Sequence, residues 1–476
     1  MTGDTTPPTT RLPSAALDRL RARVRGAVLS PDDDGYDDAR TVWNARVDRY
    51  PGVVLRCAGV ADVVAGVDVA REYDLPLAVK GGGHHVSGSA VCDDGVVLDL
   101  GPMDGVRVDP DARTARVGAG ATWGVVDHET QAFDLAVPGG QDPDIGVAGL
   151  TLGVGVGWLS RVYGLTCDNL LSADVVTAAG EWVHASESEH ADLFWALRGG
   201  GGALGVVTSF EFRLHEVHEV FAGSLVYPAE ETRAVARRYR RFVADAPREV
   251  RLLFGSMVLP DSTVYPESVR GTRVAILIAC YAGSPAEGCR VLDPLRAAGD
   301  PVMDSLRPRS YASFQRAGAS GGSARTHLRS QYVETLTDPV VDAIAEFIAD
   351  APSEGATVFV SPRGGAETDP APDATAYPHR EDAHHLLVET RWNDPDRDDD
   401  HVAWVRAFHE ALRPHTTGAV PLNFLPDDEP EARVRTAYGE NRDRLAAVKR
   451  EWDPGNLFRT ERSVDPAGED AAAGDE

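Results

Sequence analysis

Three glycines followed by two histidines form the segment of this sequence whose residue types are best suited to chemistry. The segment reads Val79-Lys80-Gly81-Gly82-Gly83-His84-His85-Val86-Ser87-Gly88 and follows a short apolar run. Glycines allow backbone N–H groups to converge without side-chain clashes, and such a nest of donors suits a diphosphate, to which Lys80 can add positive charge. The same run could instead be a plain flexible turn in which the histidines are hydrogen-bonded loop residues.

A second glycine-rich segment extends from Pro138 to Trp158 and includes Asp142. It does not fit the dinucleotide fingerprint G-x-G-x-x-G followed by a helix and a distal acid. Its last glycines, at 153, 155 and 157, alternate along the chain. This spacing indicates either backbone packed closely against a flat ligand or a glycine-rich strand packed against another strand.

Short β-rich runs alternate with helices around these two segments. Apolar residues at helical spacing predict helices over 14–28 and from Val60, and strands are expected at 77–79, 95–100 and 114–117. Residues 206–214 alternate between apolar and polar side chains, which predicts a half-buried strand. A glycine run at 198–202 is interpreted as the end of a helix that contains Phe194.

The organisation of the chain follows from where the glycine clusters thin out. We expect an N-terminal tail and helix (1–44), a cofactor-binding domain (45–216), a substrate-binding domain of mixed strands and helices (217–420), a helical C-terminal segment (421–463) and an acidic disordered tail (464–476). The 476-residue length allows roughly three lobes.

Composition narrows the class of protein. Asp and Glu number 74 against 47 for Lys and Arg, a net charge of −27, and such a surface repels nucleic-acid backbones. No run reaches the roughly 18 apolar residues needed to span a bilayer, so a soluble cytoplasmic protein is expected. The five scattered cysteines lack CxxC spacing, and we predict neither a metal site nor a disulfide framework. The acidity and the scarcity of lysine reflect either a GC-rich genome or a high-salt cytoplasm.

Taken in order, the motifs resemble those of the berberine-bridge-enzyme-like branch of the vanillyl-alcohol-oxidase flavoprotein superfamily. They are GGGHH, GVAGLTLGVGVGWLSRVYGLTCDNL, DLFWALRGGGGALGVVTSFEFRL, ATAYPHR and YGENRDRLAAVKREWDPGNLF, and together they cover about 45–460. The resemblance implies an α+β fold: a PCMH-type FAD-binding domain of two subdomains, a substrate domain with an antiparallel sheet, and a C-terminal segment that returns to the FAD domain.

The resemblance implies that His84 carries an 8α-linkage to the flavin of FAD, because its neutral imidazole can attack the electron-poor methyl carbon. His85 is expected to point elsewhere. Many members add a second bond from a cysteine, but here Asp142 occupies that place, so a single link is predicted. The remaining FAD contacts implied are Lys80, Gly81, Gly82, Gly83, Ser87, Gly88, Gly146, Val147, Gly149, Gly153, Asp168, Asn169, Val207 and Asn423.

Two further positions bear on the reaction. Similar proteins carry a Tyr-x-Asn pattern near the flavin, and here Asn423 is kept while Pro421 replaces the tyrosine. Val147 lies where similar enzymes have a small residue that leaves the flavin open to dioxygen, which implies an oxidase that releases hydrogen peroxide.

A group that accepts the substrate proton is also needed. Similar enzymes carry a carboxylate two residues earlier on the strand that contains Glu389. Residues 387, 389 and 391 share one strand face, so Glu389 could substitute and Arg391 could bind an acidic substrate. A solvated face with an ion pair is the other interpretation of these two residues.

The sequence therefore predicts an FAD-dependent oxidase of a small alcohol, sugar or secondary metabolite, with dioxygen as acceptor. A dehydrogenase or oxidative cyclase that uses another acceptor, and a flavin-holding protein without turnover, stay open as alternatives. The substrate and the oligomeric state cannot be predicted from these motifs.

Overall fold

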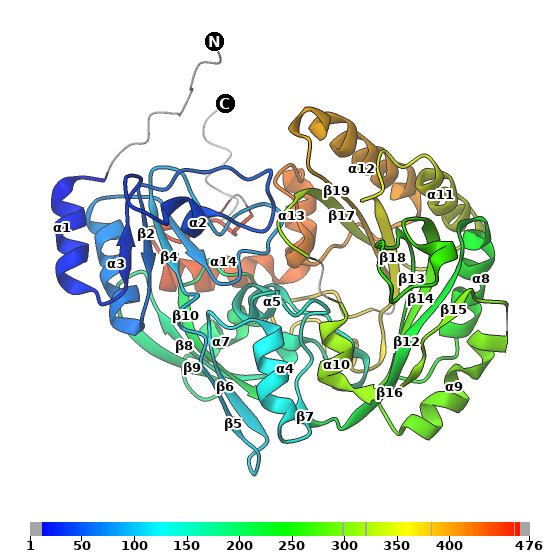
Figure 1. Ribbon diagram of the computed structural model, residues 1–476. Helices are drawn as coiled ribbons and strands as arrows, with labels where there is room; N and C mark the ends of the chain where they lie inside the picture. Colours follow the sequence, from blue (N-terminus) through cyan, green and yellow to red (C-terminus); the bar gives the residue numbers. More distant parts are fainter. Residues whose placement is uncertain (1–11, 298, 319–320, 382, 461, 467–476) are drawn as a thin grey trace.

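The molecule has two lobes, and the C-terminal helices join the first one (Figure 1). The computed structural model describes residues 12–297, 299–318, 321–381, 383–460 and 462–466. The predicted α+β class is confirmed. The positions of the predicted domain boundaries stay a prediction, and most of the two predicted tails lies outside the described residues.

A small sheet with the order β1-β2-β4-β3 opens the first lobe. Its central strands are short runs of Val and Leu buried on both faces, as expected for parallel strands covered by helices. The predicted helix over 14–28 ends early, because Gly26 must lie against the backbone of Arg56, where a Cβ would meet the carbonyl oxygen at 1.9 Å. The elements are α1 (Ser14–Arg23), β1 (Ala27–Leu29), α2 (Tyr36–Arg40), β2 (Val53–Arg56), α3 (Val60–Glu72), β3 (Leu77–Lys80) and β4 (Val96–Asp99).

A five-stranded sheet with the order β5-β6-β10-β8-β9 completes the first lobe. The predicted alternation over 206–214 is confirmed: Val206, Thr208, Phe210 and Phe212 are buried in β10. The elements are β5 (Val106–Asp109), β6 (Thr114–Gly118), α4 (Trp123–Gln131), β7 (Leu135–Ala136), β8 (Leu170–Val176), β9 (Trp182–Ser186), α7 (Ala191–Leu197), β10 (Val206–Arg213) and β11 (His215–Glu216), which pairs with β7.

The second lobe is an antiparallel sheet with the order β15-β12-β14-β13-β18-β19-β17, and β16 also pairs with β12. Helices α8, α11 and α12 bury one face of this sheet, while the other face is turned toward the first lobe (Figure 1). The strands are β12 (Glu219–Pro228), β13 (Val250–Val258), β14 (Arg273–Tyr281), β15 (Met303–Asp304), β16 (Arg307–Ser310), β17 (Arg325–Val333), β18 (Thr357–Pro362) and β19 (His384–Trp392). The helices are α8 (Thr232–Val243), α9 (Pro285–Ala297), α10 (Tyr311–Arg316), α11 (Asp338–Ala349) and α12 (Asp398–Leu412).

The C-terminal segment returns to the first lobe, as predicted. After the short 3-10 turn η7 (Leu422–Phe424), α13 (Glu431–Tyr438) lies near β17 and α14 (Arg442–Trp452) packs on α7 (Figure 1). Lys449 fixes this end of the chain, because its buried Nζ donates to Asp453 Oδ2 at 2.6 Å and to two backbone carbonyls. Other 3-10 turns are η2 (Ala229–Glu231), η3 (Glu267–Val269), η4 (Gly365–Glu367), η5 (Pro395–Arg397), η6 (Arg413–His415) and η8 (Gly439–Asn441).

The second glycine segment is not an extended strand. It forms α5 (Val147–Gly153) and α6 (Ser160–Tyr163), followed by the 3-10 turn η1 (Thr166–Asn169). The alternating glycines contact protein and not open space: a Cβ would meet Asn423 at Gly153, Thr166 at Gly155 and the carbonyl of Gly139 at Gly157. The interpretation of this alternation as a glycine-rich strand is therefore wrong, and a contact of these glycines with a flat ligand stays a prediction.

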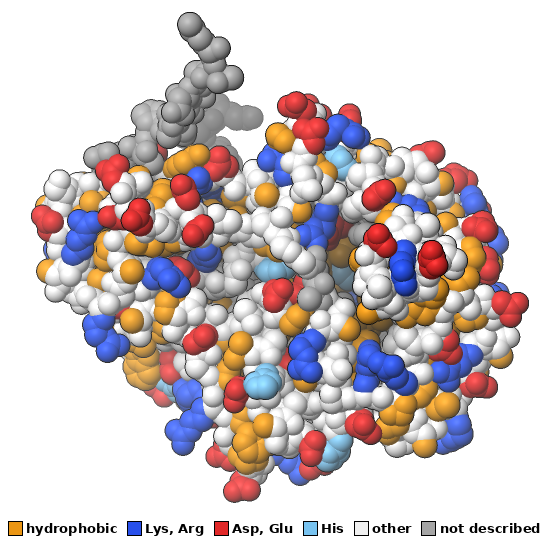
Figure 2. All heavy atoms as spheres, in the orientation of Figure 1, with side chains coloured by type: hydrophobic (Ala, Val, Ile, Leu, Met, Phe, Trp, Pro, Cys, Tyr) orange, Lys and Arg blue, Asp and Glu red, His pale blue; other side chains and the backbone are white. Residues whose placement is uncertain are grey.

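Two properties of the whole chain complete the description. All five cysteines are free thiols. Among the described residues, every helix is too short or too polar to cross a membrane. On the face drawn in Figure 2, acidic and basic side chains are interspersed, and the surface is hollowed between the two lobes.

Candidate active site

The two glycine segments meet backbone to backbone. A Cβ on Gly82 would lie 2.5 Å from the nitrogen of Gly146, and a Cβ on Gly146 would lie 2.4 Å from the nitrogen of Gly82. Any side chain at either position would therefore displace the other segment. Gly149 differs, because a Cβ there would meet nothing within 4 Å.

The turn after β3 leaves a row of backbone donors without partners. Within the described residues, the N–H groups of Gly81, Gly82, Gly83 and His84 donate no hydrogen bond. Buried or half-buried backbone donors are nearly always paired, so a row of unpaired ones indicates a bound acceptor. Phosphate oxygens fit this row, and the residues present are therefore compatible with the diphosphate of FAD.

Other predicted contacts of this loop have partners inside the protein. Lys80 Nζ donates to the carbonyls of Ala39 and Thr41 at 2.8 and 2.9 Å, so its charge caps the end of α2. Gly88 has a φ of 68° and lies against Val47, where a side chain would clash at 2.5 Å. A direct contact of either residue with the flavin stays a prediction.

The two adjacent histidines differ in how their ring nitrogens are used. His85 Nδ1 lies 2.8 Å from Ser87 Oγ, and its Nε2 lies 3.1 Å from the carbonyl oxygen of Leu422. In the described part of the chain, neither ring nitrogen of His84 has a hydrogen-bond partner. Burial lowers the pKa of His84, which favours the neutral imidazole. Of these two histidines, His84 is the one whose neutral ring has no engaged nitrogen within the described residues.

An aromatic ring fixes the imidazole of His84 from one side. The indole of Trp43 stacks on it, with ring centroids 4.8 Å apart and planes 23° from parallel. The guanidinium of Arg391 lies over the same indole, 5.3 Å from its centroid. Arg391 also donates from Nη2 to the carbonyl of Gly322 at 2.6 Å. The stack therefore runs from the second lobe to the glycine turn of the first.

Residues 42–46, which we call the strap, hold Trp43 between the lobes. The backbone N–H of Trp43 donates to the carbonyl of Gly83 at 3.1 Å. Asn44 is 2% exposed, donates to the carbonyl of Val86 at 2.6 Å and accepts from the N–H of Thr326 at 3.0 Å. The strap thus joins the glycine turn to β17.

Glu389 and Arg391 lie on the face of β19 that is turned toward the first lobe. Leu387, Glu389 and Arg391 are half-buried while Leu386, Val388 and Thr390 are buried, so the predicted sharing of one face is confirmed. Because both side chains are half-buried, a fully solvated face does not describe them. Glu389 has no hydrogen-bond or ion-pair partner among the described residues, and burial raises its pKa from 4.5 to about 7.

Asp142 and Arg391 act electrostatically on both His84 and Glu389. The Arg391 cation lowers the pKa of each group, and the Asp142 carboxylate raises the pKa of each. Such effects require proximity, so these four predicted residues lie in one site. Asp142 itself is 9% exposed and accepts a hydrogen bond from the N–H of Asp144 at 2.9 Å.

The C-terminal segment closes the site from the side of α5. Asn423 donates to the carbonyls of Gly149 and Leu150 and accepts from the N–H of Gly155, each at 3.2 Å. These bonds hold the sharp turn after α5, where Val154 has a φ of 153° and Gly155 one of 78°. Pro421, which stands in the place of the family's tyrosine, is buried and lies two residues before Asn423.

Four other predicted cofactor contacts have structural partners. Asp168 forms a bidentate ion pair with Arg380, at 2.7 and 2.8 Å. Asn169 donates to two backbone carbonyls, and its Oδ1 lies 2.7 Å from His215 Nε2. Val147 and Val207 are buried in the core of the first lobe. The side chains of Asp168 and Asn169 therefore join the TCDN and PHR motifs to the fold, and their contact with the cofactor stays a prediction.

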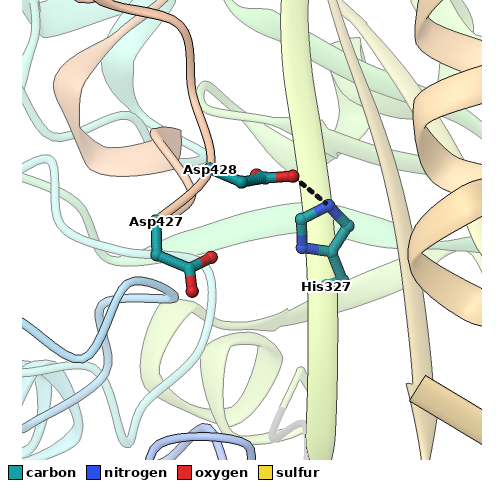
Figure 3. Close-up of side chains that lie close together, drawn as sticks. All are labelled: His327, Asp427 and Asp428. Carbon is teal, nitrogen blue, oxygen red and sulfur yellow. Dashed lines mark ion pairs between the residues drawn. The ribbon is translucent and has the colours of Figure 1, made fainter. Parts of the chain in front are cut away.

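A second group of titratable residues lies at the edge strand β17. Figure 3 shows the carboxylate of Asp428 facing the imidazole of His327, at 3.7 Å, with Asp427 beside them. Asp428 also pairs with Arg329 at 3.1 Å and with Arg406, and these cations lower its pKa. Because arginines already neutralise the carboxylate, we interpret this group as an ion-pair cluster.

Trp43 is the site residue that the sequence reasoning missed. The expected cofactor domain began at residue 45, which left Trp43 and Asn44 in the N-terminal tail. The available signal was the pair Trp43-Asn44 itself, an aromatic and a polar residue between the acidic stretch and β2.

Comparison with known proteins supports an FAD-binding domain. A family model described as an FAD binding domain matches residues 51–186, and one described as berberine and berberine like matches 422–465. The chain is 30% identical over 455 residues to YgaK, an uncharacterized FAD-linked oxidoreductase of Bacillus subtilis, covering 94% of this chain and 98% of the relative. It is also 30% identical over 457 residues to (R)-6-hydroxynicotine oxidase of Paenarthrobacter nicotinovorans, with 94% and 98% covered.

Solved structures share the whole architecture. A crystal structure of 6-hydroxy-D-nicotine oxidase from Arthrobacter nicotinovorans matches with a TM-score of 0.84 and 29% identity over 93% of this chain and 98% of that one. The berberine-bridge-enzyme-like protein 1 of Physcomitrella patens matches with a TM-score of 0.84 at 23% identity over 94% and 98%, and so shares the fold. The fold and the site define an FAD-linked oxidoreductase. The chain belongs to the berberine-bridge-enzyme-like family of these enzymes.

Proposed function

We propose that this enzyme is an oxidase that carries FAD on His84 through a single covalent bond, and that Glu389 accepts the proton of a small organic substrate. Bound FAD supplies the two-electron acceptor, and dioxygen is proposed to remove these electrons as hydrogen peroxide. The observation that carries the proposal is the carboxyl of Glu389, which has a pKa of about 7 and no partner in the described part of the chain. A base with this pKa is half ionised near neutral pH.

The contrast between the two histidines supports His84 as the linking residue. Its imidazole is neutral and has no engaged nitrogen, whereas both nitrogens of His85 have partners. Formation of an N–C bond requires an available lone pair, which His85 could offer only after losing a hydrogen bond. Asp142 cannot form a thioether, which supports one link and not two.

The surroundings of Glu389 favour a compact substrate with apolar surface. On the same sheet face, Leu387, Phe359 and Ile278 are half-buried, and Phe359 and Ile278 pack on one apolar cluster. Binding sites for small organic molecules combine such an apolar lining with few polar groups. A substrate alcohol or amine placed beside Glu389 would lose its proton to the carboxylate as its hydride leaves.

The proposed oxidase activity can be tested by mixing the anaerobic enzyme with a panel of alcohols, sugars and amines. The panel includes 6-hydroxynicotine, which the name of one relative gives as its substrate. We expect at least one compound to bleach the flavin absorbance, and admission of air to restore it with one hydrogen peroxide per flavin. Bleaching without peroxide in air would instead identify a dehydrogenase or an oxidative cyclase.

The proposed linkage has a test of its own. Acid-precipitated protein should stay yellow, with an intact mass raised by one FAD. His84→Ala should abolish this retention and His85→Ala should not. A colourless wild-type pellet would contradict the covalent bond, and the reverse pattern of the two variants would assign the bond to His85.

A further inference from the structure

The strap residue Trp43 lies where it can control how the linking histidine is presented. A free imidazole on a glycine turn samples several side-chain rotamers, because its χ2 torsion is broad. Here the indole covers one face of the His84 ring at 4.8 Å and 23°, so the ring plane is restricted. Neither ring nitrogen of His84 has a hydrogen-bond partner within the described residues.

Stacking, and not a hydrogen bond of the indole, sets this arrangement. Trp43 Nε1 is buried and has no hydrogen-bond partner in the part of the chain that the structure describes. The backbone of Trp43 is fixed instead, through its N–H to the Gly83 carbonyl and through its own carbonyl, which accepts from Ser323 Oγ at 2.9 Å. Gly83 directly precedes His84, so ring and backbone of the linking residue are positioned by one partner.

The indole also contacts a cation. The Arg391 guanidinium lies over the ring at 5.3 Å, a cation–π arrangement that further restrains the indole. Arg391 is anchored on β19 of the second lobe, and its Nη2 donates to the Gly322 carbonyl at 2.6 Å. The His84 ring is thus connected, through Trp43 and Arg391, to the strand face that carries Glu389.

We propose that Trp43 is a positioning residue for covalent attachment of FAD, because it holds the His84 imidazole in the orientation that attacks the flavin methyl carbon. This inference rests on the proposed covalent link to His84. In the step, the imidazole loses its N–H proton, the 8α-methyl group loses one C–H proton, and an N–C bond forms. The two electrons remain on the isoalloxazine together with two protons. Dioxygen then accepts the two electrons and the two protons and becomes hydrogen peroxide.

The test compares Trp43→Ala and Trp43→Phe with the wild-type full-length chain. Each protein is loaded with FAD, and samples are acid-precipitated over time. The covalent fraction is measured as intact mass, and non-covalent binding is measured by FAD fluorescence quenching. We expect Trp43→Ala to bind FAD within a few-fold of wild type and to form the covalent bond at least 10-fold more slowly. Trp43→Phe keeps a ring over His84 and should recover most of the rate.

A matched control removes a similar stack elsewhere. Trp392 stacks on His401 in the second lobe, with centroids 4.3 Å apart and planes 4° from parallel. Trp392→Phe and Trp392→Ala should form the covalent bond at the wild-type rate, whatever their melting temperatures. A general loss of stability would slow all alanine variants, whereas a positioning role slows only Trp43→Ala.

The outcomes separate this inference from the proposed linkage. If wild-type protein releases all its FAD in acid, the linkage itself fails. If wild type is covalently loaded and Trp43→Ala is loaded equally fast, the positioning role is overturned. If Trp43→Ala does not fold, a rate for Trp43→Phe equal to that of a Trp43→Leu variant overturns it, because leucine restores bulk but not the stacked ring.

Discussion

Glu389 lies on strand β19 and Asp428 contacts the neighbouring strand β17, and the surroundings of these two carboxylates give them opposite properties. Glu389 is half-buried, lacks a partner among the described residues and has its pKa raised to about 7. Asp428 is paired with Arg329, Arg406 and His327 at the edge of β17, and these neighbours lower its pKa (Figure 3). The difference teaches that burial raises the pKa of a carboxyl unless positively charged neighbours outweigh it, as they do at Asp428.

The largest effect is expected when the base is neutralised. Glu389→Gln keeps the size of the side chain but cannot accept a proton, so flavin reduction should slow by about 100-fold or more. The rate of anaerobic flavin bleaching with the best compound of the panel measures this. Asp428→Asn is the matched control, and a rate that falls equally in both variants would remove the distinction between the two carboxylates.

Asp428→Asn should reduce the stability of the protein more than Glu389→Gln does, which is the reverse of their order for the rate of flavin reduction. Asp428→Asn leaves the nearly buried Arg329 with one acidic partner fewer, and we expect a loss of about 1–3 kcal/mol in the free energy of unfolding, since the site is partly exposed to solvent. Glu389→Gln should not destabilise the protein at pH 8, because the ionised form there is disfavoured by burial. Urea denaturation of the two variants measures both values.

The pH dependence of stability should also differ in sign between the regions. Folding raises the pKa of Glu389, so its contribution is present below pH 4.5 and is lost as the pH rises through about 7. Folding lowers the pKa of His327 from 6.5 to about 4, so its contribution is present above pH 6.5 and is lost as the pH falls toward 4. Melting temperatures should be measured from pH 4 to 8. The loss of stability as the pH rises through about 7 should be absent in Glu389→Gln, and the loss as the pH falls toward 4 should be absent in His327→Gln.

The smallest effect concerns the cation beside the base. Arg391 lowers the pKa of Glu389, and its removal in Arg391→Met should raise that pKa further. The midpoint of the profile of flavin-reduction rate against pH should therefore move above about 7, by roughly one unit or less. A midpoint that moves downward would show that Arg391 does not act on Glu389 through its charge.

Periodicity predicted the regular elements well. The alternation in β10 and β19 and the helical spacing from Val60 each correspond to an observed element, because side-chain burial imposes these periods directly. The family resemblance placed His84 and Asp142, whereas Glu389 and Arg391 were predicted because they share one strand face with position 387. The structure brings all four residues together.

Tertiary contacts account for the structural features that the sequence patterns did not predict. Residues 147–153 are helical although glycine disfavours helices. Close packing against Asn423 and Thr166 leaves no room for a side chain at Gly153 and Gly155. Lys80, Asp168 and Asn169 were assigned by motif, but motif position does not reveal that their polar groups find partners within the protein. Trp43 was missed because its contact with His84 joins residues 41 positions apart.

The strap has a consequence for how molecules reach the flavin. Asn44 is hydrogen-bonded to both lobes, and the N–H of its neighbour Ala45 donates to the carbonyl of Ala324 at 3.0 Å. A hinge motion that separates the two lobes would therefore break these hydrogen bonds. We therefore expect the opening between the lobes to keep a nearly constant width, so that compounds are selected by size before any chemical recognition. Turnover in such a protein should respond little to solvent viscosity, since no large-scale rocking is needed in each cycle.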